Sequence, residues 1–584
     1  MPKGVTKDLF REFIPYYDED IFAASGLRIR NLAREADEMD IEERIERITT
    51  IFNSFRNPDK ETVLTPWRVV NMQLADTLGG WCFYDEGCKE RLMAPRRVDN
   101  GQVTKDVFHS KSQVLEINSK SGLYPLYVAY SIYRGIIDRE QMSFMITDTA
   151  VADRVAHHQK VWDRVLRDNV FVICKTPMAK SITIRTLAGF RDGVKVNARY
   201  FEDLINQITN KKEKFVKQVT SGSYWNRKDY QSMKFTAVVG NPPYQSVVAQ
   251  KESSNGQKVS VSIFHYFQII SDQLGRYVSL IYPGKRWIHR SGKGLDQFGY
   301  DQINDSHLMK LEFFPDSTDI FKDVGIADGL SIVLKDTEKK TKGFDYVYTK
   351  GGVSITSSVD NPGESLFMLN PNDNSVLNKI DLVVSKLNLK YLHDAILPRS
   401  LFGIESDFVE KNPSLVREYH NGDEFNRESE IKLFTNDKAG KAGRARWYIA
   451  DVSVLKSGHN ELHRWKVVVS SANAGGQKRS NQIAVLDNYS AFGRARVALK
   501  TFDTEAEARN FYKYATSELI RFAFLQTDES LTSLAKRVPD LLDYSDSNKF
   551  IDYSKDVDAQ LYQLFEIDSD SQNNIRSVLT TKSE

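Results

Sequence analysis

The sequence predicts a doubly wound α/β fold, in which helices cover both faces of a mostly parallel β-sheet. From about residue 110 to 335, short apolar runs alternate with segments of helical length. Several of these runs end directly in Gly, Pro, Asn or Thr, which are typical of the turns that follow strands. Because 584 residues are too many for one hydrophobic core, we expect this α/β region to be one of two or three domains.

A helical segment is expected at residues 1–60. In 40–55, DIEERIERITTIFNSF, isoleucines and phenylalanines recur at spacings of three and four, and the opposite face is charged. This pattern is typical of an amphipathic helix that packs on a core, and Pro58 would end it.

The α/β domain is expected to span residues 61–340. Residues 63–78 predict a helix with Thr65 as its N-cap and Pro66 as its first residue. A strand, a turn and a helix then follow one another twice, in 113–134 and in 169–187. The remaining elements expected are a strand at 235–240, a helix at 261–274 and a strand at 277–283.

A second domain is expected at 341–584, with mixed α+β structure and helices in 504–565. Its start is indicated by 352–377, which are rich in Gly, Ser, Asn, Asp and Pro. Basic residues then cluster with aromatic residues and glycines in KAGKAGRARWY (438–448), HRWKVVV (463–469) and YSAFGRARVALK (489–500).

The composition excludes several protein classes. Lys+Arg number 80 and Asp+Glu 78, a net charge of +2, so only local clusters of charge could favour nucleic acid. The three cysteines, Cys82, Cys88 and Cys174, form neither a disulfide framework nor a zinc motif, which fits a reducing cytosol. The N-terminal residues lack the apolar region of a signal peptide, and no run of 18 apolar residues occurs. We therefore expect a cytoplasmic protein without a metal site or a membrane helix.

The segment FTAVVGNPPYQ (235–245) predicts a binding site at the end of a strand. Five mostly apolar residues run into Gly240, and Asn241, two prolines and Tyr244 follow. Ligands of doubly wound sheets bind at the carboxyl ends of the strands. Proline fixes its own φ and restricts the residue before it, so Asn241 would be held in one orientation. The alternative is a simple turn, since Asn and Pro are turn residues.

Such a corner suits methyl transfer to an exocyclic base amine. The side-chain oxygen of Asn241 and the main-chain carbonyl of Pro242 could accept the two hydrogens of the amine, which favours a tetrahedral nitrogen whose lone pair points at a methyl donor. The base must first leave the duplex, at a cost of about a few kcal/mol. Stacking on Tyr244 would return roughly 1–3 kcal/mol.

The stretch GNPPYQ resembles motif IV of N6-adenine DNA methyltransferases. The Asn form with a preceding Gly is most similar to the Eco57I-type restriction-modification methylases. Residues 64–72 resemble motif X, while 115–129 and 174–187 lie where motifs I and II belong. Residues 277–298 resemble the strand and Gly-rich loop after motif IV. This order, followed by a target-recognition domain, is that of the gamma class.

The resemblance implies a Rossmann-like methyltransferase core, S-adenosyl-L-methionine as cofactor, and site-specific methylation of the N6 amine of a flipped adenine in double-stranded DNA. In motif I, Glu116 takes the place of the acid and Gly122 that of the last glycine, and one glycine is lost. Motif II has no adjacent acid, and Cys174 stands there as a core thiol. Either the cofactor's ribose is held by Thr176 or by a residue from elsewhere, or cofactor binding is weak. The implied catalytic residues are Asn241, Pro242, Pro243 and Tyr244; the implied cofactor-binding residues are Thr65, Pro66, Glu116, Asn118, Gly122 and Thr176.

The basic clusters of the C-terminal half are candidate contacts to DNA phosphates. Their clustering with aromatic residues favours DNA, although a solvated loop would explain any one of them. The candidates are Arg444, Arg446, Lys466, Arg494, Arg496 and Lys500, with Trp447, Trp465, Tyr489 and Phe492 beside them.

Two other functions stay open from the sequence. One is a restriction enzyme that also cleaves DNA, or a methylase that works with a separate nuclease or helicase subunit. No phosphate-binding G-x-x-x-x-G-K-[S/T] loop is present, and PDSTDIFKD (315–323) has some letters of a nuclease core but lies inside the methylase-like region. The other is a non-catalytic DNA-binding protein with a degenerate methylase core.

Overall fold

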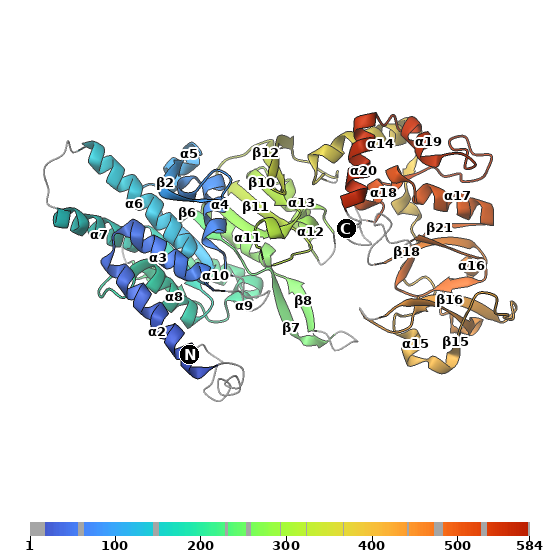
Figure 1. Cartoon of the computed structure of the whole chain (residues 1–584), viewed down its shortest axis with the longest axis horizontal. Coiled ribbons are helices and arrows are strands. Elements are labelled where there is room, and N and C mark those ends of the chain that lie inside the picture. Colours follow the sequence, from blue (N-terminus) through green and yellow to red (C-terminus); the bar gives the residue numbers. More distant parts are fainter. Residues whose placement is uncertain are drawn as a thin grey trace. The chain divides into compact units, whose positions relative to one another are not determined.

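A computed structural model of the protein describes residues 18–55, 64–143, 151–227, 232–252, 258–291, 294–322, 324–365, 367–440, 443–471, 483–526 and 534–581. The chain divides into two compact units (Figure 1). The first comprises Met1–Val248, Ser260–Lys285 and Tyr300–Glu364. The second comprises Ala249–Val259, Arg286–Gly299 and Ser365–Glu584.

The first unit opens with the predicted helical segment. Helices α2 (Glu19–Glu35) and α3 (Ile41–Asn53) are joined by the short 3-10 turn η2 (Ala36–Glu38). Asp40 caps α3, because its Oδ1 accepts from the backbone N–H of Glu43 at 2.9 Å. Ile41, Ile45 and Ile48 are buried, as the spacing predicts.

A nine-stranded mixed sheet forms the centre of this unit, in the order β13-β12-β10-β11-β9-β6-β3-β4-β5. Strands β5, β4, β3, β6 and β9 are parallel, and β11 is antiparallel to both of its neighbours. Strands β12 and β13 lie beyond residue 340, the domain boundary expected from the sequence, and join the sheet because β12 pairs with β10. The bounds are β3 (Val114–Ser119), β4 (Val170–Cys174), β5 (Asn197–Tyr200), β6 (Phe235–Gly240), β9 (Gly275–Pro283), β10 (Leu308–Phe314), β11 (Leu330–Asp336), β12 (Gly343–Lys350) and β13 (Val353–Asp360).

Both faces of the sheet are covered by helices, because successive strand residues point to opposite faces. In β4, Val172 and Cys174 pack into the core formed with α4 (Trp67–Thr77), α6 (Leu123–Ser143), α7 (Val151–Asp168) and α8 (Pro177–Ala188). Phe171 and Ile173 pack into the core formed with α9 (Leu204–Asn210), α10 (Lys212–Val219) and α11 (Phe264–Leu274). The structure therefore confirms the predicted doubly wound α/β fold.

The order of the strands reverses between β3 and β6. From β3 the chain proceeds through β4 to β5 on one side, and it then returns to form β6 on the other side of β3. In open α/β sheets, the crevice at such a switch point is where ligands bind. Smaller elements of this part of the chain are β1 (Gly80–Tyr84), β2 (Arg91–Val98), α5 (Gln102–Val107), η3 (Gly222–Trp225), β7 (Gln245–Glu252), β8 (Lys258–Ser262), α12 (Lys285–Ile288), α13 (Asp296–Ile303) and η4 (Ser317–Asp319).

The second unit combines small sheets with C-terminal helices, as the α+β prediction requires. A four-stranded sheet has the order β15-β17-β16-β20 and a three-stranded sheet the order β19-β18-β21. Strand bounds are β14 (Lys390–Tyr391), β15 (Val416–Glu418), β16 (Glu430–Asn436), β17 (Ala445–Asp451), β18 (Trp465–Ser470), β19 (Ile483–Leu486), β20 (Ser490–Phe492), β21 (Arg496–Phe502) and β22 (Pro539–Asp540). Helix bounds are α14 (Asn374–Lys386), α15 (Phe408–Lys411), α16 (His459–Leu462), α17 (Glu505–Ala515), α18 (Glu518–Gln526), α19 (Val557–Leu564) and α20 (Ser569–Thr581). Within the described parts of the chain, no helix combines the length and the apolar character needed to cross a membrane.

Candidate active site

The switch point brings Glu116 and the Asn241 corner together. Strands β3 and β6 are parallel neighbours, with Glu116 opposite Val239. A side-chain carbon built on Gly240 would lie 3.6 Å from Cγ of Glu116. Two segments far apart in the sequence therefore meet at the carboxyl edge of the sheet, where binding sites of this fold form.

The corner after β6 is stiff at both ends. Gly240 has a φ of +149°, a backbone conformation that L side chains rarely adopt, so glycine is required at the turn. Pro242 is buried, and the carbonyl of Tyr244 accepts from the backbone N–H of Ile263 at 3.1 Å. Together with the fixed φ angles of the two prolines, these contacts hold Asn241 in place.

Of the two polar atoms of the Asn241 amide, only the nitrogen has a hydrogen-bond partner among the described residues. Its Nδ2 donates to the hydroxyl oxygen of Thr65 at 3.1 Å. Its Oδ1 is buried and accepts no hydrogen bond from the described residues. A buried carbonyl oxygen without a donor costs about 1–3 kcal/mol, and such groups in native proteins often mark functional sites. Asn241 therefore presents an unused acceptor at the switch point.

Tyr244 lies against the corner and is half-buried. Its ring packs on an apolar cluster that includes Val69, Ile281 and Phe314. Burial raises the pKa of the Tyr244 hydroxyl, and the nearby amide of Asn241 acts in the opposite direction. The hydroxyl is thus neutral and lies beside the amide that the sequence singled out.

Glu116 is a buried carboxyl with one unused oxygen. The residue is only 6% exposed, and Oε2 has no hydrogen-bond partner among the described residues. Burial raises the pKa of Glu116 to about 8, against the smaller opposing effects of a hydrogen bond to Ser119 and the charge of Lys120. A ligand that brings an ammonium group would satisfy this carboxyl, so Glu116 fits the role that the resemblance assigns to it.

The loop between β3 and α6 is shaped by two left-handed residues. Asn118 has a φ of 72° and Gly122 one of 78°. A side-chain carbon on Gly122 would lie 3.1 Å from Cα of Thr183, so glycine lets α8 approach this loop. Ser119 joins the same contact, since its hydroxyl accepts from the N–H of Gly122 at 3.1 Å and lies 3.2 Å from the hydroxyl of Thr183.

The two threonines of the site differ in their use as helix caps. The sequence predicts Thr65 as the cap of the helix that follows it, but α4 begins at Trp67 with Pro66 as N-cap and without a side-chain cap. Thr65 instead bonds Asn241. Thr176 does cap its helix, since its Oγ1 accepts from the N–H of Ala179 at 3.1 Å. Cys174 is a core thiol as predicted, and burial raises its pKa to about 12.

Gln73 and Tyr124 form a buried hydrogen-bonded pair between α4 and α6 that sequence reasoning missed. The hydroxyl of Tyr124 donates to Oε1 of Gln73 at 2.5 Å. Nε2 of Gln73 donates to the backbone carbonyl of Ser279 on β9 at 3.0 Å. Both side chains sit inside ordinary helical patterns, so no local signal marks them.

In the second unit, Lys466 is not a surface cation, which corrects the prediction of a phosphate contact. It is fully buried, and its ammonium donates to the carbonyls of Leu462, Arg464 and Asp487 at 2.7, 2.6 and 3.4 Å. Burial lowers its pKa to about 7. The lysine points into the fold because it takes an inward position of β18, in the run WKVVVS.

Arg496 is also corrected, because it is only 9% exposed and its guanidinium lies 4.9 Å from the centre of the Phe434 ring. The same phenylalanine stacks on Trp447, with ring centres 4.8 Å apart. Phe492 is buried. Lys500 is bound to Asp540 at 2.6 Å. These groups are therefore used within the fold.

Three of the predicted DNA contacts remain on the surface at one end of the four-stranded sheet. Arg444 and Arg446 are exposed, and Arg446 stands opposite Thr435 across β16 and β17. Arg494 follows Gly493, whose N–H donates to the carbonyl of Phe434 on β16 at 3.1 Å. Arg446 pairs with Glu418 at 2.9 Å and Arg494 with Glu405 at 2.8 Å. Exposed ion pairs of this kind are weak, so phosphates could compete for these arginines.

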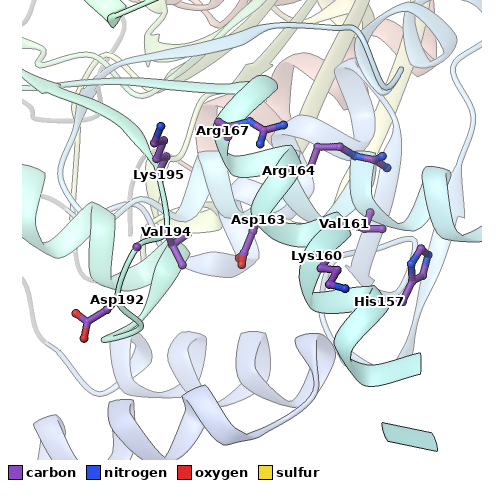
Figure 2. Close-up of a pocket in the computed structure, with 10 residues that line it drawn as sticks. His157, Lys160, Val161, Asp163, Arg164, Arg167, Asp192, Val194 and Lys195 are labelled. Carbon is purple, nitrogen blue, oxygen red and sulfur yellow. The ribbon is translucent and has the colours of Figure 1, made fainter. Parts of the chain in front are cut away.

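A separate groove of about 700 Å³ lies between α7 and residues 192–195 (Figure 2). Both segments lead into the amino ends of strands β4 and β5, at the edge opposite to the candidate site. Among its lining residues, Asp163 pairs with Arg191 at 2.8 Å and Arg167 with Asp168 at 2.7 Å. The lining as a whole is basic, with Lys160, Arg164, Arg167 and Lys195 against Asp163 and Asp192. Among the residues that the structure describes, no group of three His, Cys, Asp or Glu side chains could hold a metal ion.

Comparison with known proteins finds one family model that matches part of the chain. Residues 168–321 match the family model "Eco57I restriction-modification methylase", which confirms the resemblance. No curated protein matches the chain.

Among solved structures, the modification subunit of a putative type I restriction enzyme from Vibrio vulnificus YJ016 is 10% identical, with a TM-score of 0.33 over 59% of each chain. The type IIL restriction-modification enzyme MmeI in complex with DNA is 9% identical, with a TM-score of 0.40 over 81% of this chain and 71% of that one. The type ISP enzyme LlaBIII bound to DNA is 10% identical, with a TM-score of 0.39 over 79% of this chain, and the match spans only 35% of its own length.

Proposed function

We propose that this chain, which carries an Eco57I restriction-modification methylase domain over residues 168–321, is a site-specific DNA methyltransferase acting on the N6 amine of adenine in double-stranded DNA. The observation that carries the proposal is the unused, buried Oδ1 of Asn241 at the switch point of the sheet. An acceptor held in that place selects a ligand that brings an N–H donor. The amine of adenine is such a donor, whereas a carbonyl is not.

Asn241 and the corner around it would act directly on the amine. Oδ1 of Asn241 accepts one hydrogen of the amine, and the main-chain carbonyl of Pro242 accepts the other. With both hydrogens held, the nitrogen lone pair turns out of the base plane toward the methyl donor. The methylated nitrogen would then lose one proton to water, because the two amide oxygens accept hydrogen bonds but are too weakly basic to hold a proton. Holding the reacting atoms in such a geometry is worth several kcal/mol of the barrier.

The cofactor would be S-adenosyl-L-methionine, which supplies an electrophilic methyl group. Among the described residues, Glu116 fits it, because its buried Oε2 would accept from the amino group of the cofactor. Binding the ammonium would stabilise the ionised carboxyl and so offset the effect of burial. Pro66, Asn118, Gly122 and Thr176 stay predictions as further contacts to the cofactor.

The base would reach the site after extrusion from the duplex, with the half-buried ring of Tyr244 as its stacking partner. Arg444, Arg446 and Arg494 would contact phosphates. Because Oδ1 of Asn241 is shielded from solvent, the residues around it must move before a base can bind. A separate nuclease or helicase subunit stays a prediction.

The test is methylation in cells that express the chain. Sequencing that detects N6-methyladenine should find one recurrent DNA motif modified with the wild-type protein. The variant Asn241→Ala should leave that motif unmodified while unfolding at the same temperature as the wild type. The matched control is Asn206→Ala, which removes a half-buried amide on α9 that bonds Asp203 and should keep full modification. Unmodified DNA with the wild-type protein, or full modification with Asn241→Ala, would contradict the proposal.

A further inference from the structure

The groove between α7 and residues 192–195 lies far from the switch point of the sheet (Figure 2). Its walls lead into the amino ends of β4 and β5, whereas Asn241 follows the carboxyl end of β6. The strands between the two edges have five or six residues and are about 17–20 Å long. Any ligand of the groove would therefore be bound separately from the reacting base.

Basic residues of α7 form one wall of this groove. They recur at spacings of three, four and three, which places them on one face of the helix over about 15 Å of its length. One strand of duplex DNA carries roughly four phosphates over the same axial distance. The residues are His157, Lys160, Arg164 and Arg167.

The two arginines of this wall differ in how firmly they are paired. Arg167 is neutralised, because its guanidinium donates two hydrogen bonds to Asp168, at 3.0 and 2.7 Å. Arg164 is paired only loosely, with 3.9 Å between its guanidinium and the carboxylate of Glu140. Arg164 is also exposed, and ion pairs of exposed side chains are weak. Its charge is therefore available to a ligand.

Lys160 and Lys195 stand on the two walls and carry charge that nothing in the described part of the chain neutralises (Figure 2). Both are exposed, and neither ammonium makes a hydrogen bond or an ion pair with a described residue. Of the two acids in the lining, Asp163 is held by Arg191 through two hydrogen bonds, at 3.0 and 2.8 Å. Only Asp192 is left to oppose the two lysines.

The wall at 192–195 offers backbone donors as well. The N–H groups of Gly193, Val194 and Lys195 donate no hydrogen bond to the residues that the structure describes. Gly193 has a φ of +77°, and a side-chain carbon built on it would meet no atom within 4 Å, so the turn is open to a ligand. Backbone N–H groups and lysines both commonly donate to DNA phosphates.

The composition of the lining favours phosphates of duplex DNA over other anions. No Phe, Tyr or Trp lines the described groove, so nothing there could stack on the bases of a single strand or of a free nucleotide. Protein interfaces are enriched in aromatic residues and depleted in lysine, which disfavours an acidic protein segment. The backbone of a duplex, by contrast, is bound through charge and hydrogen bonds alone.

We propose that this groove is a second, sequence-independent site for duplex DNA, in which Lys160, Arg164 and Lys195 contact phosphates. The inference rests on the proposed function, because it adds a second contact to the same class of substrate. The contact would hold DNA outside the base pair that is being modified, and so keep the protein on DNA between target sites. It is distinct from the arginines of the second unit.

The experiment compares two double variants of the full chain. Lys160→Ala/Lys195→Ala removes the two unpaired lysines of the groove. The matched control, Lys214→Ala/Lys217→Ala, removes two exposed lysines from α10, which covers the other face of the sheet, and changes the net charge equally. Fluorescence anisotropy measures the binding of a labelled duplex of arbitrary sequence over a range of salt concentrations. Thermal unfolding confirms that both variants are folded.

We expect the groove variant to bind the duplex more weakly and to lower the slope of log K against log salt by about 1.8, the value of two phosphate contacts. The control should keep the slope of the wild type. Labelled polyglutamate is the second probe, and it should bind the wild type and both variants equally weakly.

Equal slopes for the two double variants would overturn the inference, because the groove would then be an ordinary solvated surface. Tight binding of polyglutamate that the groove variant alone loses would overturn it as well, since the groove would then serve an acidic protein segment. The proposed function is judged separately, from the methylation of a DNA motif in cells. The failure of either idea is thus read from a different measurement.

Discussion

Thr65 and Asn241 are 176 positions apart, and a 3.1 Å hydrogen bond from Nδ2 of Asn241 to Oγ1 of Thr65 joins them. The bond connects the start of α4 with the corner after β6, and so the segment resembling motif X with the segment resembling motif IV. It leaves the oxygen of Asn241 unused.

Substitutions of Thr65 should distinguish the effect of its hydroxyl on methylation from the effect of its shape. Thr65→Ser keeps the acceptor for Asn241 and should retain most of the methylation rate. Thr65→Val has nearly the same shape without the hydroxyl, and should reduce kcat by about 10-fold or more. Single-turnover methylation assays measure this, with thermal unfolding to confirm that both variants are folded. If the valine variant were as active as the serine variant, the hydroxyl would have no part in the reaction.

The binding of S-adenosyl-L-methionine should depend on pH through Glu116. The pKa of this carboxyl is raised to about 8, so its ionised fraction grows about tenfold between pH 6 and pH 7. Because an ammonium prefers the ionised form, the affinity should rise by roughly the same factor over this range. Calorimetry with the wild type and with Glu116→Gln measures this, and the variant should bind weakly at every pH.

Glu312→Gln is the matched control for that experiment. Glu312 lies on β10, is 8% exposed, and has a pKa that burial raises to about 8 as well. Its replacement should leave the pH dependence of cofactor binding intact. A wild-type affinity that does not change between pH 6 and pH 7 would remove Glu116 from the proposed site.

DNA affinity should depend on the exposed arginines of the second unit. Arg446→Ala and Arg494→Ala should each weaken binding and lower the slope of log K against log salt by about 0.9, the value of one phosphate contact. The control is Arg509→Ala on α17, since Arg509 is exposed and paired with Glu505 in the same way. Fluorescence anisotropy over a range of salt concentrations measures the slopes. Equal slopes for all three variants and the wild type would place the DNA elsewhere.

Lys466 should contribute to stability and not to DNA binding. Lys466→Ala leaves three buried carbonyls without their donor and a cavity where the side chain lay, so the free energy of unfolding should fall by about 2–4 kcal/mol. Urea unfolding measures this change. Lys386→Ala, at an exposed lysine on α14, should alter the free energy of unfolding by less than about 0.5 kcal/mol. An unchanged stability of Lys466→Ala would mean that the buried ammonium is not needed.

Gly122 should tolerate no larger side chain. Its φ is 78°, and a side-chain carbon added there would lie only 3.1 Å from Cα of Thr183. Gly122→Ala should therefore lower the free energy of unfolding by about 1–3 kcal/mol. Gly135 lies in α6 with its nearest neighbours at 3.7 Å, and Gly135→Ala should be neutral or stabilising by up to about 1 kcal/mol, because alanine favours helix. The same urea titrations compare the two, and a neutral Gly122→Ala would contradict the close packing of α8.

The sheet and its corner could be predicted because their signals are local. Strand β6 is an apolar run that ends at Gly240, and the prolines after it restrict Asn241 whatever the rest of the chain does. The partners of Asn241 could not be predicted, because Thr65 sits in a typical capping position and its actual role depends on a contact across the fold. Gln73 and Tyr124 occupy ordinary places in helices α4 and α6.

For the basic residues of the second unit, the sequence suggested a functional role that two of them do not have. Local clusters with aromatic residues suggested a DNA surface, yet Lys466 and Arg496 point inward. One signal could have identified Lys466: it lies inside the apolar run WKVVV, where alternate positions of a strand face the core. Arg496 is the first residue of strand β21, and its inward position depends on the packing of its guanidinium on Phe434, which no local pattern predicts.

The lone oxygen at the switch point has a thermodynamic consequence for discrimination between bases. Oδ1 of Asn241 accepts no hydrogen bond from the described residues, and a buried acceptor that stays unpaired costs about 1–3 kcal/mol. A base that brings an amine relieves this deficit, and a base that brings a carbonyl does not. Under the proposed function, such relief alone would favour the amine by about 5- to 150-fold, and part of the selectivity would come from the free protein's own geometry.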